Sequence, residues 1–62
     1  MDKNYLLNQL QQNSDENKRV QFNYSKDAST KTSELKILNE LENEGHIQKL
    51  TASLGYAIYQ IL

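Results

Sequence analysis

Few side chains in this sequence belong to types that carry out catalysis. His46 is the single histidine, and the chain contains no cysteine. A zinc site or a thiolate nucleophile needs several such residues at ligand spacing, so we expect neither a metal site nor a cofactor. Glu40 and Glu44 share a helix face, but paired carboxylates need an apolar pocket to raise a pKa for acid or base catalysis. The sequence therefore predicts a protein that is not an enzyme.

Basic side chains are concentrated in the middle of the chain. The net charge is −1, yet residues 18 to 36 carry five basic and two acidic side chains. Lysine and arginine neutralise phosphates, and asparagine can pair with adenine edges in the major groove. A solvent-exposed helix face holds the same residue types without any ligand. If DNA or RNA is bound, we expect the contacts to come from Lys18, Arg19, Lys26, Lys31, Thr32, Lys36 and Asn39.

Apolar and aromatic residues near the C-terminus indicate a contact with protein. The segment from Thr51 to Gly55 has no lysine or arginine, so it lacks the basic side chains that insert into a minor groove. Leu54 in this segment suits a protein surface better. Tyr56 and Tyr59 lie on opposite faces of one expected strand, so at most one packs in the core and the other is free for stacking or for a partner pocket. We predict a partner-binding site that includes Leu54, Tyr56 and Tyr59.

The first half of the chain must supply a helix and a strand. Asp2 is suited to cap a helix that runs to about Asn13, with Leu6, Leu7 and Leu10 on its apolar face. Between Lys18 and Tyr24 the apolar period changes to two, which is typical of a half-buried strand. The polar segment from Ser25 to Thr32 then offers several residues that can start the next helix.

The second half is predicted to be a long helix followed by a hairpin. Leu35, Leu38 and Leu41 form an apolar stripe from Ser29 onward, and Gly45 ends the helix because glycine enters the left-handed region at little steric cost. Strands are expected from His46 to Leu50 and from Tyr56 to Ile61, joined by a loop of about five residues. The last strand has apolar residues on both faces, so we place it in the centre of a three-stranded antiparallel sheet.

These elements define the fold class as α+β, with two main helices packed on a three-stranded antiparallel sheet in a single domain of residues 1–62. So short a chain has a small core and is expected to be marginally stable. Its apolar runs are too short for a signal peptide or a membrane span, so we expect a soluble, cytoplasmic protein. The first helix also offers Tyr5 and Leu7, beside its core stripe, as a surface for a homodimer.

The order helix, strand, helix and hairpin resembles that of winged-helix domains, a family of helix-turn-helix proteins. Leu38, Leu41, Gly45 and Ile47 match the family's apolar helix that ends in Glu-Gly-apolar before the first wing strand. The resemblance implies that the central helix is a recognition helix and that the C-terminal hairpin is the wing. The chain departs from the family because only Ser25 to Ser29 is available for the second helix, which normally braces the recognition helix against DNA.

Two functions follow from this resemblance and from the site residues. In the first, the chain is a non-catalytic accessory module of a DNA-processing system, in replication, priming or a mobile element, and binds a larger protein with supplementary nucleic-acid contact. The amide-rich composition and the size are similar to those of the small partner proteins of the polymerase-like primase on staphylococcal mobile cassettes. In the second, the chain is a small DNA-binding transcriptional regulator that uses the N-terminal half of the central helix.

Overall fold

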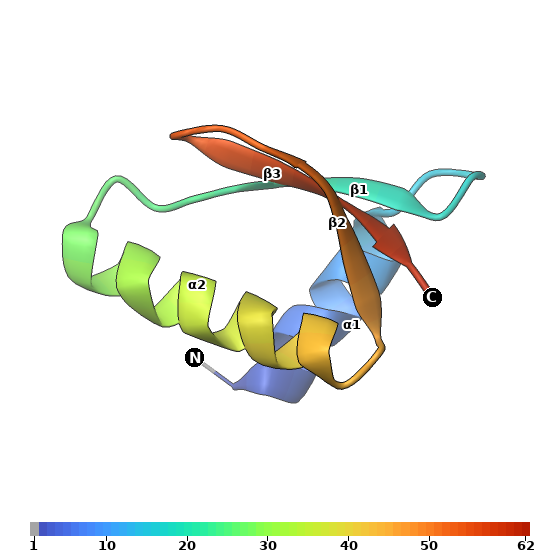
Figure 1. Ribbon diagram of the computed structural model, residues 1–62, viewed down its shortest axis with the longest axis horizontal. Coiled ribbons are helices and arrows are strands. Elements are labelled where there is room, and N and C mark those ends of the chain that lie inside the picture. The colour runs from blue at the N-terminus through green and yellow to red at the C-terminus, as the bar shows by residue number, and fades with distance from the viewer. Residues whose placement is uncertain (1) are drawn as a thin grey trace.

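The computed structural model describes residues 2–62, and two helices cover one face of a three-stranded sheet (Figure 1). The order along the chain is α1 (Lys3–Asn13), β1 (Arg19–Asn23), α2 (Ala28–Asn43), β2 (Ile47–Ala52) and β3 (Tyr56–Ile61). The predicted α+β class, with two helices and a three-stranded antiparallel sheet, is confirmed.

Local signals in the sequence account for the limits of both helices. The Asp2 side chain accepts a hydrogen bond from the Asn4 amide, which caps α1 as predicted. At the end of α2, Gly45 adopts φ +84°, and the amides of Gly45 and His46 donate to the carbonyls of Glu42 and Leu41. These two bonds form a Schellman motif. The predicted role of Gly45 in ending the helix is therefore confirmed.

The strand order is β1-β3-β2, with β3 in the centre. β2 extends beyond the predicted Leu50, because Thr51 pairs with Ile58 and Ala52 with Ala57. The connection to β3 is correspondingly shorter, from Ser53 to Gly55. The register of β2 against β3 shifts between Lys49 and Thr51, which makes Leu50 the extra residue of a β-bulge.

The core lies between the sheet and the two helices. Its fully buried residues come from all five elements: Leu6, Leu10, Val20, Leu38, Leu41, Ile47, Ala57 and Tyr59. α1 packs against β1, and α2 packs against β2. The alternation predicted for the first strand is present, since Val20 is buried while Phe22 and Tyr24 pack partly against the core. Each helix is therefore positioned by the strand that it covers.

No separate helix lies between β1 and α2 in the described chain. Residues 24–27 form a loop, and Asp27 caps α2, which begins at Ala28. Of the residues from Ser25 to Thr32 that can start this helix, Asp27 therefore supplies the cap. Residues 2–62 form two helices, so this part of the chain lacks the brace that a winged helix places between its first strand and its recognition helix.

Candidate functional site

The end of the molecule that holds the β2–β3 turn brings together residues from three parts of the chain. The Tyr24 amide donates to the Gly55 carbonyl at 3.0 Å, which ties the end of β1 to the turn. Lys31 Nζ, in the first turns of α2, donates to the Leu54 carbonyl at 2.8 Å. The same ammonium lies 5.4 Å from the centre of the Tyr24 ring, within cation–π distance. We call this group, with Tyr56 at the start of β3, the tip cluster.

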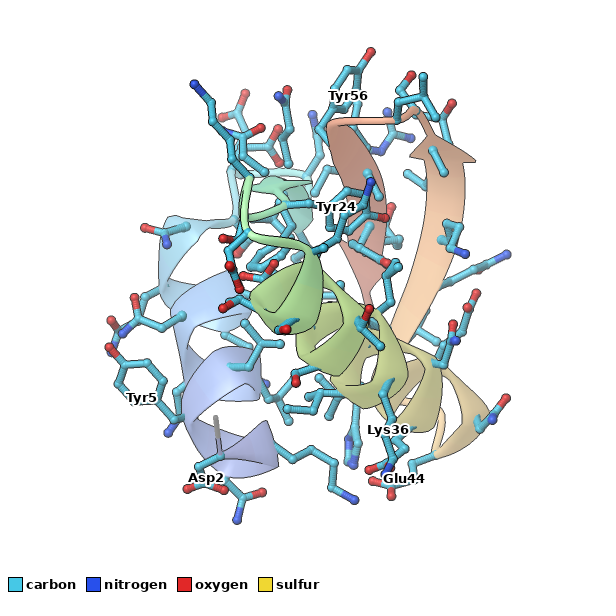
Figure 2. All side chains as sticks on the ribbon, turned by 90° about the vertical axis from the view of Figure 1, so that its left-hand side faces the viewer. Asp2, Tyr5, Tyr24, Lys36, Glu44 and Tyr56 are labelled. Carbon is cyan, nitrogen blue, oxygen red and sulfur yellow. The ribbon has the colours of Figure 1, made fainter. Side chains whose placement is uncertain are left out.

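Leu54 is the most exposed large apolar residue of the tip cluster. Its side chain is 91% exposed, although its backbone carbonyl is held by Lys31. Tyr56, at the start of β3, is 37% exposed and projects from the sheet on the side away from the helices, whereas Tyr24 lies between the sheet and α2 (Figure 2). The tip therefore presents apolar surface at a fixed place in the fold.

The loop before α2 is held by a buried carboxylate that the sequence analysis did not single out. Glu34 is only 6% exposed, and its Oε1 accepts a hydrogen bond from the Ser25 amide at 2.8 Å. This bond fixes the loop that carries Lys26. The signal in the sequence is spacing alone, since Glu34 precedes Leu38 by four residues and Leu41 by seven and so shares their helix face.

Replacing Glu34 by alanine is expected to lower the free energy of unfolding by about 1–3 kcal/mol, because the Ser25 amide loses its partner in a part-buried place. Glu34→Gln keeps an oxygen acceptor at the same position and should retain most of that stability. Urea unfolding followed by circular dichroism measures both variants. Equal losses for the two variants would show that the hydrogen bond is not what matters at this position.

The N-terminus of α2 is occupied by a side chain of the protein itself. Asp27 accepts hydrogen bonds from the amide and the hydroxyl of Thr30, both at 2.9 Å. The Thr30 amide, followed by the Thr30 hydroxyl, holds the pKa of the Asp27 carboxyl below its ordinary value of 3.8. The helix end that the sequence analysis places nearest to DNA therefore already carries a carboxylate.

The cap at Asp27 makes stability depend on pH. Because the folded-state pKa of Asp27 is lowered, the cap stabilises the fold above pH 3.8 and is lost as the pH falls through the folded-state pKa. Asp27→Asn keeps a capping oxygen but does not titrate. We expect its urea midpoint to fall less than that of the native chain between about pH 5 and pH 2. Identical pH profiles for the two chains would contradict this expectation.

The basic residues predicted to bind nucleic acid do not form one patch. Lys31 lies at the tip and Lys26 in the loop before α2, whereas Lys18 and Arg19 lie at the opposite end of β1. Thr32, Lys36 and Asn39 are exposed along α2, and Figure 2 shows Lys36 on the side of α2 away from the sheet. The described fold therefore divides the basic residues among several places.

The residues predicted to bind a partner are only partly brought together. Leu54 and Tyr56 are exposed near the tip, but Tyr59 is 1% exposed and belongs to the core. The prediction that Tyr59 contacts a partner is wrong, because Tyr59 lies on the face of β3 that the helices cover. Burial, with Tyr24 nearby, raises the pKa of the Tyr59 hydroxyl above its ordinary value.

Two further features bear on the class of site. Within residues 2–62, no three His, Cys, Asp or Glu side chains converge as a metal site requires. Neither helix of the described chain is long and apolar enough to cross a membrane.

No family model matches the chain, and no curated protein and no solved structure matches it either. The chain's own residues are therefore the basis for assigning a function.

Proposed function

We propose that this chain is a non-catalytic accessory module that docks on a larger protein of a DNA-processing system through the tip cluster. The observation that carries the proposal is the 91% exposed Leu54 on a turn whose backbone is held in place. A large apolar side chain in water is unfavourable, and burying a leucine contributes about 1.5–3 kcal/mol. Because the turn is already ordered, little conformational entropy is lost when Leu54 enters a pocket.

The chemistry of the tip favours one kind of partner surface. Leu54 and Tyr56 supply an apolar centre, and Lys31 lies beside it on the Leu54 carbonyl. This arrangement suits an apolar pocket with acidic residues on its rim, because opposite charges around a buried centre fix the orientation of docking. The winged-helix resemblance supports assigning the partner to DNA replication, priming or a mobile element, and any nucleic-acid contact is supplementary.

Co-expression with the product of the adjacent gene, followed by size-exclusion chromatography, tests the proposal. We expect a stable complex, and Leu54→Asp should weaken it by roughly tenfold to a hundredfold. Leu62→Asp is the matched control, because Leu62 is also exposed but lies at the other end of the sheet. Separate elution of the two native proteins, or a complex that Leu54→Asp leaves intact, would overturn the proposal.

A DNA-binding transcriptional regulator is the second candidate, because Thr32, Lys36 and Asn39 are exposed at helical spacing along α2. In this function, Lys36 neutralises a phosphate and Asn39 reads a base edge. Fluorescence anisotropy with duplex and single-stranded DNA should show binding that weakens with salt and with Lys36→Ala. Unchanged anisotropy at low salt and tens of micromolar protein would exclude this function.

A further inference from the structure

The two outer strands of the sheet differ in how well their free edges are covered. On β2, the outward amide of Lys49 donates to Glu42 Oε2 at 2.9 Å, so a side chain of α2 covers the middle of this edge. On β1, Lys18 and Tyr24 are bonded toward β3, so the intervening odd-numbered residues direct their backbone groups outward. Arg19 is one of these, and Asp15 binds both its amide and its carbonyl. Within residues 2–62, the outward backbone groups of Gln21 and Asn23 have no hydrogen-bond partner.

The uncovered part of β1 is short and symmetric about Phe22. Arg19 bounds it on one side through its bonds to Asp15, and Ser25 bounds it on the other because its amide donates to Glu34. A long foreign strand would meet a blocked backbone at both ends. A second copy of the same segment, from Gln21 to Asn23, matches the length of the uncovered part.

The side of α1 that lies next to this edge is free of charge. Between Asn4 and Asn13, α1 contains only amides, leucines and Tyr5, although 24% of all residues in the chain are charged. Tyr5 is 59% exposed and projects from α1 on the side away from α2 (Figure 2). Because α1 packs on β1, an outer strand, that side of α1 and the edge of β1 face the same way. Depletion of charge together with exposed tyrosine is typical of the centre of a protein interface.

We propose that two copies of this chain form a dimer through the free edge of β1 and the uncharged side of α1. An antiparallel pair centred on Phe22 places Gln21 opposite Asn23 of the second copy, and each such pair exchanges both of its hydrogen bonds. The twofold axis is then perpendicular to the sheet, so both α1 helices lie on the same face of a continuous sheet. Phe22, which is half-buried, meets its own copy between the two α1 helices.

Sedimentation equilibrium of the full chain from micromolar to millimolar concentration tests this dimer. We expect the mass to approach twice that of one chain. Gln21→Pro removes the outward amide without touching the bonds to β3, and it should weaken association about tenfold or more. In Asn8→Lys, the new lysine of one copy would repel that of the other copy across the twofold axis, so association should weaken as well. Asn43→Lys is the matched control, because Asn43 is an exposed asparagine at the end of α2 and should leave association unchanged.

Hydrogen exchange supplies a second measurement on the same protein. The amides of Gln21 and Asn23 should exchange at least about tenfold more slowly at high concentration than at low concentration, since they gain partners only in the dimer. The Lys49 amide, already bonded to Glu42, should exchange at the same rate at both concentrations.

A monomer at every concentration would overturn the dimer, and so would association that both Gln21→Pro and Asn8→Lys leave unchanged. If Gln21→Pro fails to fold, the association of Asn8→Lys alone tests the dimer. Leu54→Asp should dimerise like the native chain, because Leu54 lies outside the proposed interface. Failure of the dimer is therefore distinct from failure of the docking function.

Discussion

Tyr59→Ala is expected to remove a third or more of the protein's free energy of unfolding. Tyr59 is among the largest of the side chains that are fully buried, at 1% exposure in the central strand β3. Removing a buried aromatic side chain costs about 3–5 kcal/mol through lost transfer free energy and the cavity left behind. A chain of 62 residues has only about 3–9 kcal/mol of total stability on average values per residue. Urea unfolding and the dispersion of amide signals in an NMR spectrum measure the loss.

Two variants show whether the effect of Tyr59→Ala comes from the core. Tyr59→Phe keeps the ring and should keep the fold, whereas Leu54→Ala removes an exposed side chain and should change stability by less than about 0.5 kcal/mol. Loss of partner binding in Tyr59→Ala would report unfolding rather than a lost contact. A folded Tyr59→Ala protein with near-native stability would contradict the placement of Tyr59 in the core.

The limits of the elements could be predicted from the sequence because short-range chemistry sets them. Asp2 and Gly45 act on amides and carbonyls of their own helix ends, so their roles are local. The alternation of Val20 and Phe22 likewise reflects one sheet with one covered face. The end of β2 was less predictable, since Thr51 and Ala52 join the sheet only by pairing with β3.

The positions of the candidate site residues could not be predicted from the periodicity of apolar residues. β3 has apolar residues on both faces. Their alternation divides them into two sets but does not say which set the helices cover. The structure places Tyr59 in the core and Tyr56 on the outer face. The basic residues are neighbours in the sequence, yet β1 (Arg19–Asn23) lies between them and separates Arg19, at its start, from Lys26, beyond its end. Proximity in the chain was therefore a poor guide to proximity in space.

The prediction of the apolar stripe on α2 was only partly correct, because periodicity did not identify which residues the core covers. Leu38 and Leu41 are buried, but Leu35 is only partly buried, and the third buried position belongs to Glu34. A carboxylate is seldom buried without a partner. The partner of Glu34 is the Ser25 amide, which donates a hydrogen bond to it and belongs to a loop whose path no local pattern predicts. The helix face is thus rotated toward Glu34 relative to the face of the three leucines.

Leu38→Ala and Leu35→Ala test this rotation directly, because they make the same substitution one turn apart on the same helix. Leu38 is 1% exposed within the core cluster, so its truncation should cost about 2–5 kcal/mol. Leu35 keeps part of its surface in water and should cost less than about 1.5 kcal/mol. Urea unfolding of the two variants under identical conditions gives the difference. Equal losses would place the centre of the buried face between the two leucines and would remove the reason why Glu34, rather than Leu35, meets the core.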